Sequence, residues 1–295
     1  EILDDMTFIE ANGFTEHKTT IRSGLPSGTW RKLNYGVQPE KSRTVPIKDS
    51  LGMLETYAEV DKALADLNGN SAAWRLSEDR AFIEGLNQTM ASTLFYGDSS
   101  LDPEKFTGLT PRYNLLSAEN GINIVDAGGT GSDNASIWLI VWGPNTCHGI
   151  YPKGSPAGLQ SRDLGEDTLI DAAGGRYQGY RTHYKWDNGL TLRDWRYVVR
   201  IANIDVSDLT KNAASGGDLI DLLTQAIELI PNLGMGRPVF YMPRKLRSFL
   251  RRQIANKVAA ATLTMEEVAG KKVVAVDGIP VRRTDALLLT EARVV

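Results

Sequence analysis

The chain has 295 residues, of which 42% are hydrophobic and 23% charged, a composition typical of a globular protein rather than a disordered one. Its formal net charge of −3 argues against tight, non-specific nucleic-acid binding by the whole surface, and no apolar run approaches the roughly 18 residues of a membrane span. Acidic residues near the start break the pattern of a signal peptide, so neither a signal peptide nor a membrane partner is expected.

The first 57 residues carry little apolar surface of their own. Residues 1–28 are polar and broken by glycine and proline, which predicts an irregular arm that packs on something else. Residues 29–57 contain two short extended runs around a charged tip, and Pro39 and Pro46 favour a hairpin of the edge type that projects into solvent. Because such a hairpin is only marginally stable alone, we expect a neighbouring chain to support it.

Two helices are predicted next, a short one over 58–67 and a long one over 71–96. Ser71 is a good N-cap residue for the long helix, and Gly97 and Asp98 end it. Its apolar residues recur at three, four or seven positions and form one stripe, made of Leu76, Ile83, Leu86, Met90 and Leu94. A helix of about 25 residues is about 37 Å long, which suggests a strut rather than a binding helix.

Residues 113–206 are rich in extended runs separated by turns that contain glycine and asparagine. The strongest hairpin signal in the chain is Asn188-Gly189, because both residues tolerate the positive φ of a two-residue turn. A β-rich segment is therefore predicted, with one hairpin at this dipeptide.

The pattern then changes to alternating helices and strands. An amphipathic helix is predicted over 216–231, a short buried strand over 237–242, and a second helix over 243–258 that has proline in its first turn. Two extended runs close the chain and are joined at Asp277-Gly278.

No catalytic motif is complete in this chain. Residues 69–73 resemble a nucleophile elbow around Ser71, but a helix and a turn precede the serine where the motif needs a strand, so the N-cap role is favoured. Residues 128–133 are rich in glycine, yet they lack the Gly-Lys-Ser/Thr ending that binds phosphates. A plain loop is predicted there.

Cysteine and histidine are rare and scattered. Cys147 is the only cysteine, so an intrachain disulfide is excluded and a cysteine-based metal site is disfavoured. His17, His148 and His183 lie on different segments without a zinc-binding spacing, and Cys147 and His148 point to opposite faces if they lie on a strand. Structural roles are predicted for all three histidines, and no metal, cofactor or catalytic residue is expected.

The second helix of the C-terminal part is strongly basic. Its cations are Arg244, Lys245, Arg247, Arg251, Arg252 and Lys257. They surround an apolar stripe of Leu246, Phe249, Leu250, Ile254 and Val258. A nucleic-acid helix has this appearance, but an intersubunit or solvated face is favoured because runs of charge usually form such faces and the whole chain is acidic.

Three groups of turn and packing residues have a recognisable order along the chain. They are Phe95-Tyr96-Gly97-Asp98, Phe106-Thr107-Gly108-Leu109, and Asp277-Gly278-Ile279-Pro280-Val281 with Thr284-Asp285. In this order, after an arm and a projecting loop, they resemble the major capsid proteins of tailed bacteriophages. None of these motifs is a catalytic signature, so the resemblance rests on their order over most of the chain.

The resemblance implies an α+β fold of the tailed-phage major capsid type, with an N-terminal arm, an extended β-loop, a peripheral domain with a spine helix, and an axial domain. The implied boundaries are 1–28 for the arm, 29–57 for the loop, 58–112 for the peripheral domain with the spine helix at 71–96, 207–280 for the axial domain and 281–295 for a returning C-terminal strand. The β-rich segment 113–206 departs from the simplest plan of this family. Whether it extends the peripheral sheet or forms an inserted domain stays open.

The resemblance further implies a structural subunit that assembles into pentamers and hexamers and encloses the phage genome in an icosahedral head. The virion is then its location, with assembly in the host cytoplasm. Implied partners are other copies of the chain, scaffolding, portal and cement proteins, and packaged DNA contacted non-specifically on the inner face. Intersubunit ion pairs are expected from charged residues of the loop, namely Arg31, Lys32, Glu40, Lys41 and Arg43.

Three other functions remain open from the sequence. A nanocompartment shell shares the implied fold and differs by its enclosed cargo. An enzyme with its active site in 113–206 would have a deep pocket lined by residues such as Asp133, His148 or His183. A nucleic-acid binder would use residues 244–257 and would show salt-sensitive affinity for DNA.

Overall fold

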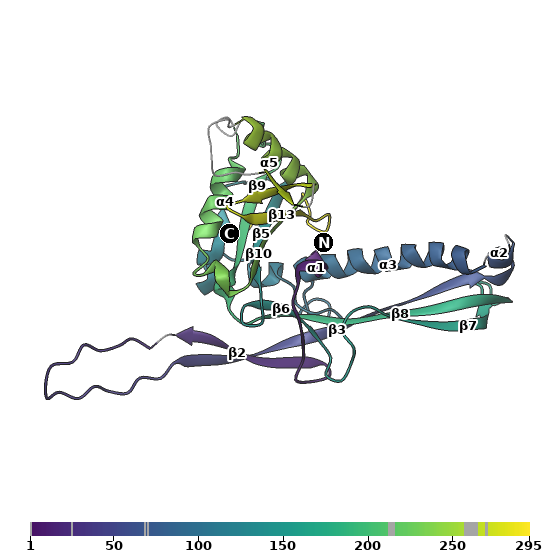
Figure 1. The fold of residues 1–295 in the computed structure, drawn as a ribbon, viewed down its shortest axis with the longest axis horizontal. Coiled ribbons are helices and arrows are strands. Elements are labelled where there is room, and N and C mark those ends of the chain that lie inside the picture. The colour runs from purple at the N-terminus through teal and green to yellow at the C-terminus, as the bar shows by residue number, and fades with distance from the viewer. Residues whose placement is uncertain are drawn as a thin grey trace.

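The structure, a computed structural model, describes residues 2–24, 26–67, 69, 71–211, 216–256, 265–268 and 271–295. Figure 1 shows two parts, an upright lobe and an elongated lobe that runs past its base in both directions. The upright lobe holds β4, β5, β9 to β13, α4 and α5, and the elongated lobe holds β2, β3, β6 to β8, α2 and α3. Within the described residues, no helix is both long and apolar enough to cross a membrane.

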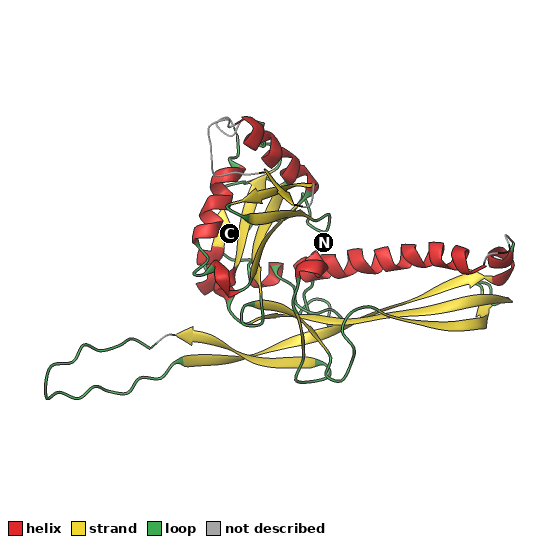
Figure 2. Ribbon diagram, viewed as in Figure 1, coloured by secondary structure: helices red, strands yellow, loops and turns green. Residues whose placement is uncertain are grey.

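The helices and strands alternate irregularly along the chain (Figure 2). The helices are α1 (Ile2–Asp5), α2 (Lys62–Asp66), α3 (Ser71–Tyr96), α4 (Leu219–Glu228) and α5 (Arg244–Asn256). The first strands are β1 (Phe8–Glu10), β2 (Glu16–Gly24), β3 (Arg43–Asp61), β4 (Ile124–Asp126), β5 (Asn134–Trp142), β6 (Cys147–Tyr151) and β7 (Gln160–Ile170). They are followed by β8 (Arg176–Leu192), β9 (Val198–Asp205), β10 (Arg237–Met242), β11 (Met265–Val268), β12 (Lys271–Val276) and β13 (Ile279–Arg283).

One hydrogen-bonded path of strands links the two lobes, in the order β11-β12-β13-β10-β5-β6-β8-β3-β2. Strand β9 adds to β5, β4 adds to β9, and β7 adds to β8. The link between the lobes is narrow, because β5 and β6 share only the Trp142–Cys147 pair. Residues 113–206 therefore do not form a unit of their own, since β4, β5 and β9 belong to the upright lobe and β6 to β8 to the elongated lobe.

The core of the upright lobe forms around β5, which is buried along its whole length. Its odd-numbered residues Ile137, Leu139 and Val141 join a cluster with α4 and α5, while Trp138, Ile140 and Trp142 join a second cluster on the opposite face. A strand covered on both faces needs apolar residues at every position, which explains the unbroken run in the sequence.

The long helix predicted over 71–96 is confirmed, because α3 spans 26 residues from Ser71 to Tyr96. Only its second half is buried, at Leu86, Met90, Leu94 and Phe95, whereas Leu76 in the predicted stripe is 54% exposed. The helix lies along the sheet of β3 and β8 (Figure 1).

The motif Phe106-Thr107-Gly108-Leu109 caps the C-terminal end of α3. The Leu109 amide donates to the Leu94 carbonyl at 3.0 Å, and the Gly108 amide donates to the Gly97 carbonyl at 2.8 Å. A Cβ on Gly108 would lie 2.6 Å from the Thr93 carbonyl oxygen, which is closer than any side chain can approach. This motif therefore gives a partner to the Leu94 carbonyl in the last turn of the helix, which would otherwise lack one.

The predicted arm and hairpin differ from the structure. Residues 1–28 are not irregular, because they contain α1, β1 and β2. The hairpin pairs β2 with β3, so it is longer than residues 29–57, and the loop between the strands covers residues 26–42 where it is described. Strand β3 also continues to Asp61, so helix α2 is shorter than the helix predicted over 58–67. The reason is that residues 51–61 pair with β8, and this pairing overrides the local preference for a helix.

The prediction of a hairpin at Asn188-Gly189 is wrong. Both residues lie inside β8, which continues to Leu192 and pairs with β3 and β6. Neither residue has a positive φ. The glycine is needed for packing instead, because a Cβ there would lie 2.7 Å from the Ser50 carbonyl oxygen. The turn at Asp277-Gly278 is confirmed, with φ values of 49° and 77°.

Candidate functional site

The loop between β2 and β3 is the most exposed segment of the molecule. Every residue from 26 to 42 is exposed, and the loop projects away from both lobes (Figure 1). Internal contacts are few: the Tyr35 amide donates to the Lys32 carbonyl at 3.3 Å, and the Ser27 hydroxyl donates to the Glu40 carboxylate at 3.3 Å. Such a segment has no core of its own to hold it in place.

The five predicted contact residues, Arg31, Lys32, Glu40, Lys41 and Arg43, all lie in or beside this loop and are exposed. Arg43 is the first residue of β3. Within the part of the chain that the structure describes, none of the five forms an ion pair. The structure therefore brings them to one projecting segment, where the Glu40 carboxylate accepts the hydrogen bond from Ser27.

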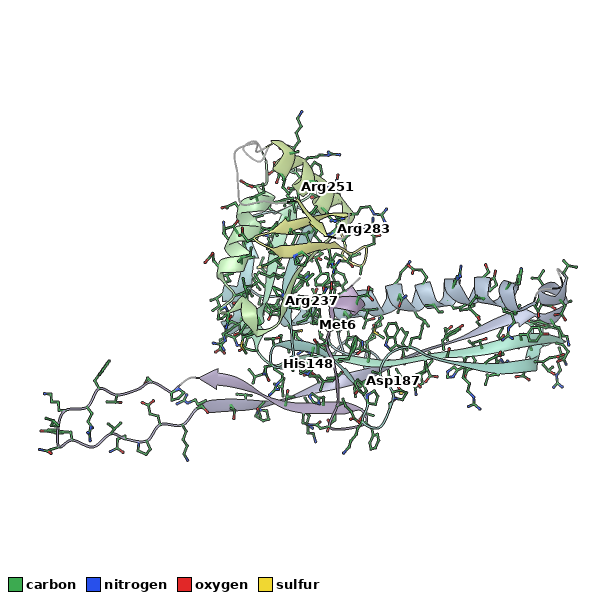
Figure 3. All side chains as sticks on the ribbon, viewed as in Figure 1. Met6, His148, Asp187, Arg237, Arg251 and Arg283 are labelled. Atoms are coloured by element: carbon green, nitrogen blue, oxygen red, sulfur yellow. The ribbon has the colours of Figure 1, made fainter. Side chains whose placement is uncertain are left out.

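The sequence-based prediction missed the apolar residues of the same loop. Trp30 is fully exposed, Leu33 is 86% exposed and Tyr35 is 69% exposed, with Val37 at 48%. Figure 3 shows the side chains of the loop extending into solvent on both sides of the chain. A tryptophan without any covering residue is unusual in a monomer and indicates a protein–protein contact. The signal in the sequence was the alternation of Leu33, Tyr35 and Val37 with polar residues.

The base of the loop is fixed to the body. Asp49 of β3 is buried and accepts a hydrogen bond from the Arg112 guanidinium at 2.8 Å. The same guanidinium donates to the carbonyls of Thr107, Gly108 and Leu190. These contacts tie β3 to the cap of α3 and to β8, so the loop has a fixed origin and a free tip.

The N-terminal segment is attached to the upright lobe through Asp5 of α1. Its buried carboxylate pairs with Arg237 at 2.8 Å and Arg282 at 3.2 Å and accepts from the Tyr241 hydroxyl at 3.0 Å. Burial and the neighbouring Asp5 raise the pKa of Tyr241, so its hydroxyl stays protonated and donates. Figure 3 places Arg237 and Met6 at this junction.

A buried polar network joins the end of α3 to the C-terminal segment. Glu291 pairs with Arg200 at 2.7 Å, and both side chains are almost fully buried. The Tyr96 and Ser136 hydroxyls also donate to the Glu291 carboxylate, and Tyr96 accepts from the Leu288 amide at 2.9 Å. Burial, followed by Glu291, raises the pKa of Tyr96. Beyond the end of β13 at Arg283, these side chains and backbone bonds such as the one from the Glu291 amide to the Asn134 carbonyl hold the returning segment 281–295.

The structure brings two of the three histidines together, which the sequence did not indicate. The rings of His17 and His148 lie 6.3 Å apart and line a cavity of about 450 Å³ with Arg193. Burial, with His17 and Arg193 nearby, lowers the pKa of His148 to about 4, and burial also lowers the pKa of His17. His183 instead stacks on Tyr57 in the elongated lobe at 4.6 Å.

The arrangement of these groups does not form a catalytic constellation. Cys147 is buried, which raises the pKa of its thiol to about 12 and keeps it unreactive. Asp133 directly precedes β5 in the upright lobe and does not line the His17–His148 cavity. Across the described ranges, no cluster of histidine, cysteine and carboxylate residues could hold a metal ion.

Helix α5 has the predicted amphipathic form. Leu246 and Leu250 are buried against the core, while Lys245, Arg251 and Arg252 are exposed. Arg244 pairs with Asp285, and the Arg252 guanidinium lies 5.1 Å from the centre of the Phe249 ring. Lys257 and Val258, which the sequence assigned to this helix, lie outside the described residues.

Comparisons with known proteins agree with this architecture. The family model described as major capsid protein GP7 matches residues 1–295. The solved structure of bacteriophage Epsilon15 is similar over 98% of this chain and 88% of its own, at 40% identity and a TM-score of 0.74. The bacteriophage JBD30 capsid is similar over 96% of this chain and 89% of its own, at 10% identity and a TM-score of 0.55. No curated protein matches the chain.

Proposed function

Because the chain belongs to the family of major capsid protein GP7 and is a structural subunit that self-associates into a shell, we propose that it builds the head of a tailed phage through pentamers and hexamers. The observation that carries the proposal is the loop 26–42, which is exposed at every residue and bears Trp30, Leu33 and Tyr35. A loop of this kind gains its order and its burial only from another copy.

We propose that Trp30 is the anchor of this contact. A tryptophan buries about 150–250 Å² when covered, which corresponds to about 4–6 kcal/mol of transfer free energy at about 25 cal/mol per Å². Ordering the loop offsets part of this gain. A net contribution of about 2 kcal/mol in each contact is typical of an anchor residue and corresponds to about 30-fold in affinity.

The charged residues Arg31, Lys32, Glu40, Lys41 and Arg43 would then form the rim of the contact. Exposed ion pairs contribute about 1 kcal/mol or less each and are screened by salt. They would set the register of the loop on the neighbouring copy, while the apolar residues supply most of the affinity. Because the contact repeats around a closed shell, weak individual contributions add up.

The virion is the location of a subunit of this kind, and we propose that assembly takes place in the host cytoplasm. Scaffolding, portal and cement proteins are proposed partners, and packaged DNA would touch the inner face without sequence preference. The match to a phage capsid family favours the head over a nanocompartment shell. We also propose that the subunit is not an enzyme, a view supported by the separation of Asp133, His148 and His183.

The test compares wild-type protein with Trp30→Ala by size-exclusion chromatography and negative-stain electron microscopy over a range of concentrations. We expect wild-type protein to form closed shells or discrete pentamers and hexamers, and Trp30→Ala to need about 30-fold more protein for the same yield. Leu101→Ala is the matched control, because Leu101 is 81% exposed but lies outside the loop.

Two results would count against the proposal in different ways. Shells that form equally well with Trp30→Ala would refute the role of the loop anchor and leave the shell function standing. Wild-type protein that stays monomeric or dimeric under every assembly condition would contradict assembly through pentamers and hexamers.

A further inference from the structure

The two sides of the upright lobe carry opposite charge on their exposed helices. Helices α4 and α5 cover the same face of the sheet, since both pack on Ile137, Leu139 and Val141 of β5 through one apolar cluster. Helix α4 contacts β4 and β9, α5 contacts β13, and the two helices also contact each other. Figure 1 shows α4 on the left of the lobe and α5 on its upper right.

The side formed by α5 is basic. Lys245, Arg251 and Arg252 are exposed, and none of them forms an ion pair with another described residue. The Arg252 guanidinium lies on the Phe249 ring, which orders the cation without neutralising it. The sequence of α5 contains no acidic residue.

The side formed by α4 is acidic. Asp221 and Glu228 are exposed, and α4 contains no cation. Gln225 lies between them on the same stripe and donates to Asp221 at 2.6 Å, which holds that carboxylate at the helix surface. Glu228 has no partner among the described residues. The apolar face of α4 is fully occupied by the core, so only this polar face is available to another molecule.

The charges on the two helices have the same spacing. Asp221 and Glu228 are seven residues apart, and so are Lys245 and Arg252. Seven residues are about two helical turns, or about 10.5 Å along the axis. Two helices that lie side by side can therefore form two ion pairs at once, one near each end.

We propose that α5 of one copy docks beside α4 of the next copy in a ring, with Lys245 and Arg252 paired to Asp221 and Glu228. The contact is heterologous, because it joins two different sides of the same lobe, and a rotation that repeats it closes a ring. Opposite charges on the two sides also disfavour the wrong arrangements, α4 beside α4 and α5 beside α5. The inference rests on the ring assembly proposed above and names the surfaces that form the ring.

Charge complementarity favours a second copy over nucleic acid as the molecule that binds the exposed face of α5. A polyanion would neutralise the basic side and be repelled by the acidic side of the same lobe. A second copy neutralises Lys245 and Arg252 on one side and Asp221 and Glu228 on the other, with matched spacing. The two occupants predict different results when the charges are exchanged.

The experiment uses full-length protein and three variants: Lys245→Glu/Arg252→Glu, Asp221→Lys/Glu228→Lys, and the fourfold combination. Each double variant places like charges across the contact, so we expect the protein concentration needed for shells to rise about tenfold or more. The fourfold variant exchanges the charges of both sides and restores complementarity, so it should assemble within about threefold of wild type. Circular dichroism of each unassembled variant checks that it is folded.

Assembly of the fourfold variant is decisive, because no damage to the fold would be repaired by two more charge reversals. If both double variants fail and the fourfold variant fails equally while folded, the two helices do not meet and the proposal is overturned. If Lys245→Glu/Arg252→Glu assembles normally but loses salt-sensitive binding to a duplex DNA probe, α5 is a nucleic-acid surface and the proposal is likewise overturned. Failure of wild-type protein to form shells would instead overturn the proposed function.

Discussion

Replacement of Glu291 by alanine tests the buried network that joins α3 to the C-terminal segment. The variant leaves the Arg200 guanidinium, which is 2% exposed, without its charged partner at 2.7 Å. The Tyr96 and Ser136 hydroxyls lose their acceptor at the same time. Removal of one partner from a buried ion pair costs about 3–5 kcal/mol, because the remaining charge stays desolvated.

This loss is large against the about 5–15 kcal/mol that separates most folded proteins from their unfolded states. We expect the free energy of unfolding to fall by about 3–5 kcal/mol and the melting temperature by about 10 °C. Urea unfolding of unassembled subunits, followed by tryptophan fluorescence, measures the change without the contribution of the shell.

Glu59→Ala is the matched control. Glu59 pairs with Arg181 at 2.8 Å, nearly the same distance, but its side chain is 37% exposed and the arginine 27%. Water replaces the lost partner there, so the cost should be about 1 kcal/mol or less. The double variant Arg200→Met/Glu291→Leu should be far less destabilised than Glu291→Ala, because no buried charge remains. Equal losses for Glu291→Ala and Glu59→Ala would refute the argument from burial.

Two further variants test other parts of the structure. Gly108→Ala should lower the free energy of unfolding in urea by more than about 2 kcal/mol, because the new Cβ would lie 2.6 Å from the Thr93 carbonyl oxygen. Gly85→Ala, in the open middle of α3, is the control and should stabilise the protein by up to about 1 kcal/mol. A Gly108→Ala variant as stable as wild type would contradict the close approach. His148, with its pKa lowered to about 4, stays neutral in the folded protein while it gains a proton on unfolding, so stability should be complete above about pH 6.5 and should fall as the pH drops from there toward 4. His148→Leu should flatten this part of the urea midpoint–pH curve, and an unchanged slope would show that another group is responsible.

Local signals in the sequence predicted several elements correctly. The long helix over 71–96 and the helices from 219 and 244 follow from apolar spacing at their buried faces, and the turn at Asp277-Gly278 follows from two residues that accept positive φ. These features depend on residues within about one or two turns of one another, so a single sequence contains the information.

Other features depend on partners far away in the chain. Asn188-Gly189 has the residues of a tight turn, but pairing of β8 with β3 along eleven positions, from Leu51 to Asp61, keeps it extended. The same pairing shortens the helix predicted over 58–67. A long ladder of backbone hydrogen bonds outweighs a local preference of about 1 kcal/mol.

The candidate contact site divides in the same way. Its charged residues were predicted from the resemblance to capsid proteins and the charge of the loop, while the exposure of Trp30 became visible only once the structure showed that no described residue covers it. Likewise, the Arg200–Glu291 pair joins residues 91 positions apart, and only tertiary packing brings the acidic helix α4 and the basic helix α5 to the same face of one sheet.

The sequence by itself thus determined the three longer helices, the turn at Asp277-Gly278 and the polar projecting loop, because these depend on near neighbours and on composition. Only the tertiary structure decided which strands pair, which charges are buried and which apolar side chains stay exposed, because each of these depends on contacts between distant parts of the chain.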